Sequence, residues 1–480
     1  MAVKIFSAST GSLNNELRFS VKHSYYSLEL KNILSKADFF PLKEILKSPP
    51  QYGAGSAGRD FEEGDEYRYI RITDIDRYGN LHEDEVKSTD IDNEERYELK
   101  DNDFLFARSG NTVGKSFLYN SAKHGKALYA GYFIRFKIDF SNIEPKFFLY
   151  YTKSKIFDTW KNSIIRLMGQ PNINAEEYKL LPIPMIDKEV QLDAIKRISK
   201  IETEIEQLKR KITEPLEIIN RHLAKEFKYS PTLWREFGKG MTASTQKSDV
   251  KRYSTFSMPS GQVKRSRIFR FSSRFHNPFT QKLMDVLSQY PMIMVADIIT
   301  ERIKRGVQPR ADPDGEAYAI KTAQLKNNYI ELEDCEKVSL DFYDKNKKAQ
   351  LKQGDIVMSS TGKVSLGKVD LIEFEEEAIA DGHVSIIRID EKRCNKLFFI
   401  YFFRSILGTF QIERDFTGAT NQIELYADQI EAFVLPDISV QRQVKIVELI
   451  KMELDSQKKM EKQIDEKQAQ ISGIIEATIK

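Results

Sequence analysis

The sequence predicts an α+β protein in which one mixed α/β unit occurs twice and each copy is followed by a long helix. Two observations predict this. Short motifs recur in the same order at a spacing of about 250 residues, far longer than the period of a solenoid repeat. Each copy then ends in a long run with apolar residues at steps of three and four, which is typical of a helix with one apolar face. The sequence therefore indicates a duplicated domain with a pseudo-two-fold organisation.

Composition and charge exclude several classes of protein. Of the 480 residues, 41% are hydrophobic, so the chain can bury real cores and is not mostly disordered. Cys335 and Cys394 alone cannot form a disulfide framework or a four-cysteine zinc site. No apolar run reaches the ~18 residues of a membrane span and no signal peptide is visible, so we expect a cytoplasmic protein without membrane contact. The net charge is only +3, so any nucleic-acid surface has to be local.

The clearest repeat is a glycine-containing turn between two β-type runs. Asp103–Lys115 and Asp355–Lys368 both read as an aspartate, an apolar run, a glycine and a closing Gly-Lys. This pattern predicts a β-hairpin. The other pairs, in order, are Leu17–Ser20 with Phe269–Ser272, Ile70–Ile75 with Ile320–Leu325, Phe147–Tyr150 with Phe398–Tyr401, Gly169–Asn172 with Gly418–Asn421, and Pro184 to Gln191 with Pro436 to Gln443.

Each copy follows the same predicted plan. Short β-like runs come first, a proline-containing segment closes them (Leu181–Pro184, Val434–Pro436), and the helix begins. We therefore predict a first mixed domain at residues 1–186, a central long helix at 187–228, a linker at 229–262, a second mixed domain at 263–438 and a C-terminal long helix at 439–480.

The two helical stretches resemble each other closely. Each spans about 40 residues, or about 60 Å, with Lys and Glu between the apolar positions. Their matched length favours a coiled coil between them, although an ordinary amphipathic helix on a globular domain gives a similar pattern. Pro215 lies inside the first stretch and is expected to kink or restart it.

Glycine-rich segments suggest nucleotide binding, but the details disagree. Gly53–Gly58 fits G-x-G-x-x-G, yet two prolines precede it and a charged loop follows, so a glycine loop is favoured. Gly110–Ser116 is one residue short of a P-loop, and Gly362–Lys368 is followed by Val369 instead of Ser or Thr. A β-hairpin turn that presents Lys115 and Lys368 is the better interpretation. No catalytic constellation is visible, so we expect no catalytic residue and no metal or cofactor in this chain.

Polar and basic residues on the predicted turns and short strands are the candidates for DNA contact. Arg pairs with guanine, Asn or Gln with adenine, and Lys with phosphate. Solvated surface charge explains any one of them, and the duplicated arrangement is what favours function. The stretch from Lys247 to Arg274 is strongly basic, but a solvated linker explains it about as well as DNA contact does. The candidates are Arg71, Arg77, Arg108, Ser109, Lys115, Gln170 and Asn172 in the first copy and Arg305, Arg310, Lys321, Lys363, Lys368, Asn421 and Gln422 in the second.

Taken together, these ordered and duplicated motifs resemble the specificity subunit of type I restriction–modification systems over nearly the whole chain. The carriers are the two Asp-to-Gly-Lys hairpins, the two G-x-x-N turns and the two P-x(6)-Q helix entries. Gln422 after the second G-x-x-N turn and the linker after Phe227 depart from the pattern.

The resemblance implies two target recognition domains that each read one half of a split double-stranded DNA site. It implies that the long helices pack antiparallel, set the spacer and dock two methyltransferase subunits, through apolar positions at Ile198, Ile205, Ile212, Val447, Leu454 and Ile464. Restriction and motor subunits would join that core. S-adenosylmethionine, ATP and Mg²⁺ would then belong to the partner subunits and none to this chain.

Several expectations follow, and alternatives stay open. Insertion of residues near Glu204 should change the spacer, and because Ser48–Glu66 and Glu301–Glu316 differ strongly, the two half-sites should differ. DNA affinity of the isolated chain should be modest and salt-dependent. The alternatives are a specificity subunit of another methylation-based defence system, a nucleotide hydrolase that uses the near-P-loops, and a coiled-coil scaffold.

Overall fold

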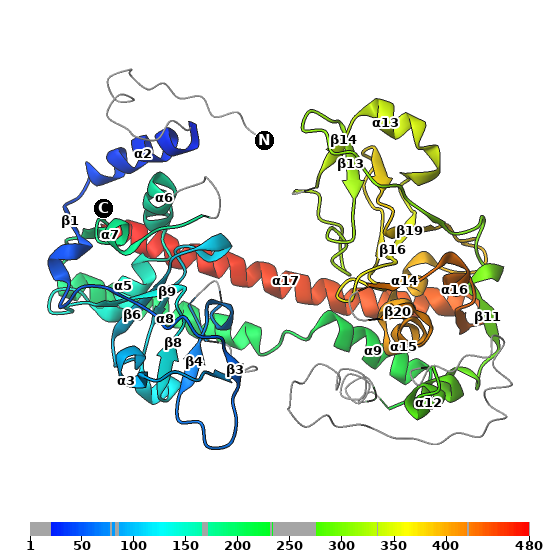
Figure 1. Ribbon diagram of the computed structural model, residues 1–480, viewed down its shortest axis with the longest axis horizontal. Coiled ribbons are helices and arrows are strands. Elements are labelled where there is room, and N and C mark those ends of the chain that lie inside the picture. The colour runs from blue at the N-terminus through cyan, green and yellow to red at the C-terminus, as the bar shows by residue number, and fades with distance from the viewer. Residues whose placement is uncertain are drawn as a thin grey trace. The chain divides into compact units, whose positions relative to one another are not determined.

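The computed structural model describes residues 21–76, 79–81, 86–165, 171–230, 233, 275–333, 335–419 and 422–479. The basic stretch 247–274, most of the predicted linker and the repeat pair at 17–20 and 269–272 lie outside the described residues. The chain forms two compact units, which Figure 1 shows with their elements labelled. Unit 1 consists of residues 1–211 and 460–480, and unit 2 consists of residues 212–459.

Unit 1 contains the first mixed domain, Phe39–Pro184. Its main sheet is antiparallel, and the order of its strands is β2, β9, β6, β7. Strands β4 and β8 pair in parallel, β3 pairs with β5, and β1 pairs antiparallel with β10 where the domain begins and ends. The bounds are β1 Phe39–Pro41, β2 Gln51–Tyr52, β3 Arg59–Asp60, β4 Arg68–Ile70, β5 Lys87–Ser88, β6 Asp103–Ala107, β7 Ser116–Leu118, β8 Ala127–Tyr129, β9 Phe133–Lys137 and β10 Pro182–Pro184.

Helices cover this sheet and build an aromatic core on it. All of β6 is buried, and Phe106 stacks on Phe157 and on Tyr178, with ring centroids 5.9 Å and 4.6 Å away. Such large aromatic side chains supply most of the apolar area that a domain of this size buries. The helices are α2 Val21–Leu34, α3 Glu94–Tyr97, α4 Ser121–His124, α5 Pro145–Tyr151, α6 Lys155–Ile164 and α7 Ala175–Tyr178, with 3-10 turns η1 Leu42–Ile45, η2 Ile72–Asp74 and η3 Gly110–Thr112.

Unit 2 contains the second mixed domain, Met292–Pro436, which repeats this topology. Its main sheet runs β12, β19, β16, β17, a parallel pair β13–β18 stands in a second sheet of order β14, β13, β18, β15, and β11 pairs with β22. The strands are β11 Met292–Met294, β12 Lys304–Arg305, β13 Ala317–Ile320, β14 Lys337–Val338, β15 Gln350–Leu351, β16 Ile356–Ser359, β17 Val369–Leu371, β18 Ala378–Ala380, β19 Val384–Ile387, β20 Thr417–Ala419, β21 Gln422–Glu424 and β22 Val434–Pro436. The helices are α12 Pro278–Leu287, α13 Leu340–Lys345, α14 Lys396–Arg404, α15 Ile406–Asp415 and α16 Ala427–Glu431, with 3-10 turns η5 Val295–Asp297 and η6 Lys347–Ala349. The duplicated mixed α and β architecture expected from the sequence is therefore present.

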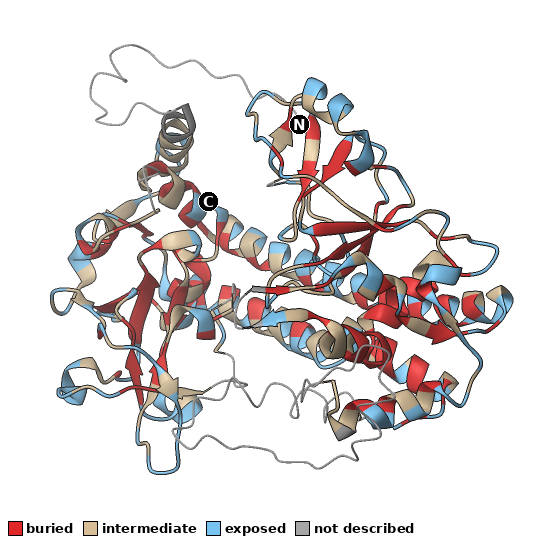
Figure 2. Cartoon of the chain, turned by 45° about the vertical axis from the view of Figure 1, so that its right-hand side comes forward, coloured by how far each residue is buried: buried red, intermediate tan, exposed pale blue. Residues whose placement is uncertain are grey.

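The long helices form from the predicted stretches. The first stretch is two helices, α8 (Lys188–Lys209) and α9 (Pro215–Glu226), and Pro215 occupies the start of α9 as predicted. The second stretch is one helix of 40 residues, α17 (Val440–Ile479). Figure 2 shows that these helices alternate buried and exposed residues, whereas the strands of both mixed domains are largely buried.

Helix segments from both stretches contribute to each unit. In unit 1, Glu204 of α8 forms an ion pair with Lys467 of α17. In unit 2, Glu226 of α9 pairs with Arg442 of α17, and Arg221, five residues earlier on α9, pairs with Glu453, eleven residues later on α17. Residue numbers thus rise along α9 while they fall along α17, so these two segments run antiparallel within unit 2.

The P-x(6)-Q motif has a structural explanation in both copies. The amide of Gln191 accepts from the backbone of Glu144 at 2.7 Å and donates to the carbonyls of Asn142 and Ile186 at 2.9 and 2.8 Å. Gln443 makes the same three bonds in unit 2, to Asn395 at 2.7 Å, Arg393 at 3.2 Å and Ile438 at 2.9 Å. Both glutamines are buried, so each holds the first turn of its long helix against the mixed domain.

The apolar positions expected to bind a partner face inward. Five of the six are buried in the chain's own packing and Ile212 is partly buried. A side chain that already packs inside the chain cannot also contact another subunit. The prediction that these five residues bind a partner is therefore wrong. The five are Ile198, Ile205, Val447, Leu454 and Ile464.

Candidate nucleic-acid interface

The duplicated hairpin lies beside the G-x-x-N segment in unit 1 and beside the residues that follow this segment in unit 2. In unit 1, the amide of Gly110 donates to the Pro171 carbonyl at 2.9 Å, and Ser109 forms a bridge with Asn172. In unit 2, the amide of Gly362 donates to the Ile423 carbonyl at 3.2 Å, and Thr361 forms a bridge with Glu424. Two motifs that are about 60 residues apart in the sequence therefore form one surface, as loops carried on a rigid sheet often do.

The glycines at the ends of each turn have left-handed backbone. Gly110 and Gly114 have φ of 71° and 88°, and Gly362 and Gly367 have φ of 88° and 79°. Residues with a Cβ rarely adopt these values, which explains why glycine recurs at both ends. The next segments, β7 and β17, are strands and not helices, so no helix N-terminus faces a phosphate. The prediction of a β-hairpin in place of a P-loop is confirmed.

In unit 1, the surface presents a cation on an aromatic platform. The guanidinium of Arg108 lies over the ring of Tyr52, 5.1 Å from its centroid, and its Nε donates to the Gly131 carbonyl at 3.2 Å. Among the described residues, the two terminal amino groups of Arg108 have no hydrogen-bond partner. They are available to a phosphate or to the acceptor edge of guanine.

Two further residues of unit 1 lie at this surface. The hydroxyl of Ser109 is buried and has no partner within the described part of the chain. Tyr132, whose carbonyl accepts from the Arg108 amide at 3.0 Å, is 58% exposed. Sequence reasoning missed Tyr132. The signal was present, because Gly131-Tyr132 and Gly382-His383 stand at corresponding places in the two copies, and the His383 carbonyl accepts from the Ser360 amide at 2.9 Å.

In unit 2, the arginine on the corresponding surface comes from the strand position of Tyr52 and is neutralised by a carboxylate. Arg305 forms an ion pair with Glu424, donates to the Leu425 carbonyl at 2.7 Å and lies over the Tyr426 ring at 5.2 Å. The hydrogen bond from Arg305 lowers the pKa of the Glu424 carboxyl. An arginine–aromatic pair thus occurs in both copies, but only the first copy leaves its guanidinium largely uncommitted.

Three predicted contact residues are engaged inside the chain. Arg71 binds Asp74 at 2.5 Å, and Lys321 binds Glu336 at 2.6 Å. The ammonium of Lys115 donates to the Ile75 carbonyl at 2.6 Å, and burial lowers its pKa. The prediction that the hairpin turn presents Lys115 is therefore wrong, because the side chain points back into unit 1.

Of the remaining predicted residues, some lie at or near the surface and others lie outside the described residues. Arg310 and Lys363 are exposed, Lys368 is half-buried at the end of its turn, and Gln422 begins β21. Arg77, Gln170 and Asn421 lie outside the described residues. The structure therefore leaves the contribution of each of these residues to DNA contact as a prediction.

The described part of the chain gives no support to a dinucleotide site, a metal site or a membrane span. Gly53 follows β2 and lies so close to the Ala130 carbonyl that a Cβ there would come within 2.3 Å of its oxygen, which explains the glycine without a dinucleotide. Within the described ranges, no cluster of three or more His, Cys, Asp or Glu residues could hold a metal ion. In that same part of the chain, no helix is long and apolar enough to cross a bilayer.

A family model decides what these two surfaces belong to. The model of the type I restriction modification DNA specificity domain matches residues 19–217 and again residues 296–467, so one match falls on each mixed domain and its following helix. The chain belongs to this family of DNA specificity domains. Its role is DNA recognition in a type I restriction–modification system, and it carries two of these domains. No curated protein matches the chain.

Three solved structures match the chain at low sequence identity. One comes from work on complex assembly and conformational transition of the type I system; it is 12% identical, with 92% of this chain and 96% of that chain covered and a TM-score of 0.39. The specificity subunit from M. genitalium is 14% identical over the same shares, with a TM-score of 0.38. The HsdS subunit from Thermoanaerobacter tengcongensis is 12% identical over the same shares, with a TM-score of 0.29.

Proposed function

We propose that this specificity subunit reads a bipartite, asymmetric site on double-stranded DNA, with one half-site for each mixed domain. The observation that supports it is the pair of surfaces beside the hairpins, which share a backbone arrangement and differ in their side chains. The first offers Arg108, Tyr52 and Tyr132, whereas the second offers the paired Arg305 and Glu424. Different donor and acceptor sets select different base pairs, so the two half-sites differ.

The electrostatics of the chain fit a reader that works inside a larger complex. A net charge of +3 supplies little non-specific attraction to a polyanion, and much of the cationic surface of the hairpin region is committed to internal carboxylates. Partner subunits therefore supply much of the surface that binds the DNA duplex. Affinity of the isolated chain for DNA is modest and falls steeply with salt.

The long helices form the spacer and the dock in this proposal. They run antiparallel as a coiled coil and hold the two readers at a fixed separation. Two methyltransferase subunits dock on them, and restriction and motor subunits join that core. Leu449 and Met452 of α17 are exposed apolar side chains one turn apart, which makes them better docking candidates than the buried seam. This chain is non-catalytic, and S-adenosylmethionine, ATP and Mg²⁺ bind the partners.

The proposal is tested by expressing the chain with its methyltransferase subunit and mapping methylated adenines across the host genome. The expected result is one bipartite, asymmetric motif that disappears when this chain is omitted. A motif that persists without the chain, or a contiguous motif, contradicts the proposal.

The spacer function has its own test at the break between α8 and α9. Residues 210–214 are not helical, so four residues inserted there leave the Glu204–Lys467 pair in place. The mapped motif should keep both half-sites and change only the spacer length. The same insertion between Glu375 and Glu376, in the exposed segment between β17 and β18 at the other end of β17 from the hairpin turn, serves as a control that leaves the spacer unchanged.

A further inference from the structure

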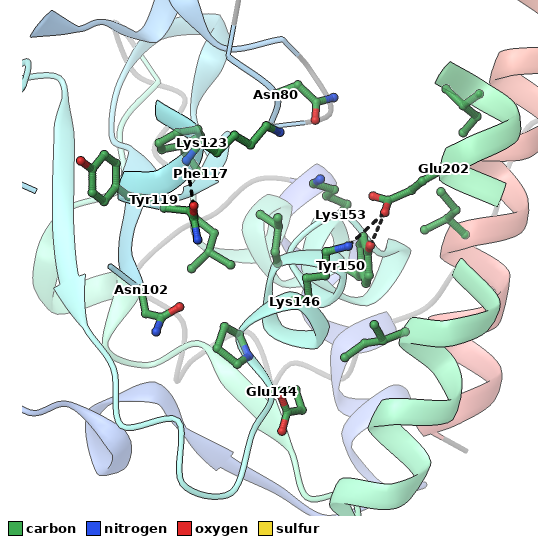
Figure 3. Close-up of a pocket in the computed structure, with 18 of the residues that line it drawn as sticks. Asn80, Asn102, Phe117, Tyr119, Lys123, Glu144, Lys146, Tyr150, Lys153 and Glu202 are labelled. Atoms are coloured by element: carbon green, nitrogen blue, oxygen red, sulfur yellow. Dashed lines mark hydrogen bonds and ion pairs between the residues drawn. The ribbon is translucent and has the colours of Figure 1, made fainter. Parts of the chain in front are cut away.

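Unit 1 holds a cavity whose counterpart in unit 2 is closed. The cavity has a volume of about 750 Å³ and lies between the mixed domain and the helices α8 and α17. Phe117, Leu149, Ile195 and Ile471 supply apolar walls, and Lys153 supplies a cation. In Figure 3, the dashed lines to Glu202 come from Tyr150 and Lys146, and none reaches Lys153.

The counterpart in unit 2 is identified by the repeat. Lys153 comes three residues after the tyrosine of the Phe-Phe-Leu-Tyr motif, and Arg404 comes three residues after the tyrosine of Phe-Phe-Ile-Tyr. Phe117 pairs with the second residue after Asp103, and Asp370 pairs with the second residue after Asp355. Arg404 and Asp370 line a pocket of only about 100 Å³.

In unit 2, an ion pair seals the site. Arg404 binds Asp370 at 2.5 Å, and their side chains are 8% and 1% exposed. Arg404 also donates to the Val369 carbonyl at 3.0 and 2.9 Å, and Asp370 accepts from the Asn327 amide at 2.9 Å. Arg404 and Asp370 therefore neutralise each other within the chain.

In unit 1, the site keeps a cation, Lys153, but has no acid in the position of Asp370. Phe117 stands where unit 2 has Asp370, and within the described part of the chain Lys153 makes no hydrogen bond or ion pair. Its ammonium lies 5.8 Å from the centre of the Tyr150 ring and against Gly79, where a Cβ would come within 3.4 Å of Nζ. Burial lowers the pKa of Lys153 to about 8.

Neighbouring acids do not neutralise this lysine, because each has another partner. Glu202 accepts from the Tyr150 hydroxyl at 2.5 Å and pairs with Lys146 at 3.5 Å. Glu144 pairs with Lys188 at 3.1 Å, and Asp76 and Glu206 both pair with Lys209, at 3.7 and 3.8 Å. A partly buried cation without a carboxylate partner is costly to the fold unless something else supplies a negative charge.

We propose that this cavity is a binding site for a small molecule that carries one anionic group and an apolar body. The anion binds the ammonium of Lys153, and the body packs between the first mixed domain and the two long helices. The volume lies in the range of small-molecule sites, which are mostly apolar with a few polar groups that fix orientation. Since the walls come from both the domain and the helices, the ligand stabilises their contact in unit 1.

The probe for this site is 8-anilinonaphthalene-1-sulfonate, titrated by fluorescence against the full chain. Its neutral analogue N-phenyl-1-naphthylamine has a similar apolar body and no anion. Lys153→Met should weaken binding of the sulfonate about tenfold or more, which corresponds to one charge-assisted contact, and leave binding of the neutral analogue within about twofold. Lys153→Arg should retain sulfonate binding, and Lys458→Met, at the rim of the sealed pocket, should leave both titrations unchanged.

The outcomes separate the ligand site from a structural role. Equal sulfonate affinity in the wild-type chain and in Lys153→Met overturns the proposal, since the dye then binds elsewhere. Equal loss of both dyes also overturns it, because the substitution has then distorted the cavity. The proposed DNA recognition depends on the hairpin surfaces and not on this cavity. The dye titrations can therefore fail without affecting the methylation test, and the reverse also holds.

Discussion

The two units share a scaffold and differ in what their side chains do at corresponding places. Both have the same sheet order, the same hairpin and the same glutamine at the start of a long helix. At the hairpin surface, however, unit 1 has Arg108 over Tyr52 without a carboxylate partner among the described residues, whereas in unit 2 Arg305, at the strand position of Tyr52, is paired with Glu424. At the helix-facing cavity, unit 1 leaves Lys153 open where unit 2 has paired Arg404 with Asp370. The two copies therefore share their backbone architecture and differ in the side chains of the proposed DNA-binding and ligand-binding sites.

The largest expected effect on stability comes from breaking the Arg404–Asp370 ion pair in unit 2. Asp370→Ala leaves the buried Arg404 without its acid and should destabilise unit 2 by about 3–5 kcal/mol. Differential scanning calorimetry of the full chain measures it. The double variant Asp370→Ala with Arg404→Met is the control and should recover most of the loss. A loss below about 1 kcal/mol would show that the pair is not what closes this pocket.

The next effect tests whether the two glutamines are equivalent. Gln191→Leu and Gln443→Leu each remove three hydrogen bonds from a buried helix entry and should each cost about 2–3 kcal/mol. Urea unfolding followed by circular dichroism measures both. Val190→Leu, on the exposed side of the same turn, should change little. A large loss for one glutamine and none for the other would break the correspondence of the two copies.

Substitution of Lys153, which has no carboxylate partner among the described residues, should raise the stability of unit 1 instead of lowering it. Because the pKa of Lys153 falls to about 8 from 10.5, the folded state resists its protonation, and the cost to stability is fully present below pH 8. Lys153→Met should therefore stabilise unit 1 by about 2 kcal/mol at pH 7, allowing for partial exposure of the side chain.

This gain should shrink as the pH rises from 8 to 10.5, since the unfolded chain then also loses the proton. Glu202 and Asp76 oppose the shift while Lys209 and Lys146 add to it, so Lys209→Met serves to test how far neighbouring charge matters. Unfolding midpoints at pH 7 and at pH 10.5 measure the change. A pH-independent gain would mean that packing, and not charge, is responsible.

The smallest expected effect concerns recognition. Arg108→Ala should cost about 1–3 kcal/mol of discrimination at one position in one half-site, and Arg305→Ala should act on the other half-site only. Methylation frequencies at near-cognate sites in the two variants measure this. Lys347→Ala, on an exposed turn of unit 2, serves as the surface control. If both arginine variants relax the same half-site, the two domains are not independent readers.

How much the sequence predicts depends on what makes a motif recur. The hairpin glycines and the P-x(6)-Q glutamines recur because both copies need the same backbone, and they predicted the duplicated fold. Asp103 and Asp355 recur for the same reason, since each accepts a turn amide, from Lys100 at 3.0 Å and from Lys352 at 2.9 Å.

The candidate site could be predicted only in part. Arg108 was found because it adjoins the hairpin motif, whereas Arg71, Lys115 and Lys321 turned out to bind groups within the chain. Whether a cation is free depends on acids and carbonyls that are distant in the sequence, and no local pattern reports them. Tyr132 escaped notice because its counterpart His383 differs in type, which is what a surface that reads different bases requires.

The central claim is that one frame carries two independent readers, and a domain exchange tests it most directly. Strands β1 and β10 pair at the base of the first mixed domain, and β11 and β22 pair at the base of the second, so Phe39–Pro184 can replace Met292–Pro436 at matched ends. Expressed with its methyltransferase subunit, this chain should direct methylation to a site with two copies of the first half-site. A site that keeps the original second half-site would contradict the account.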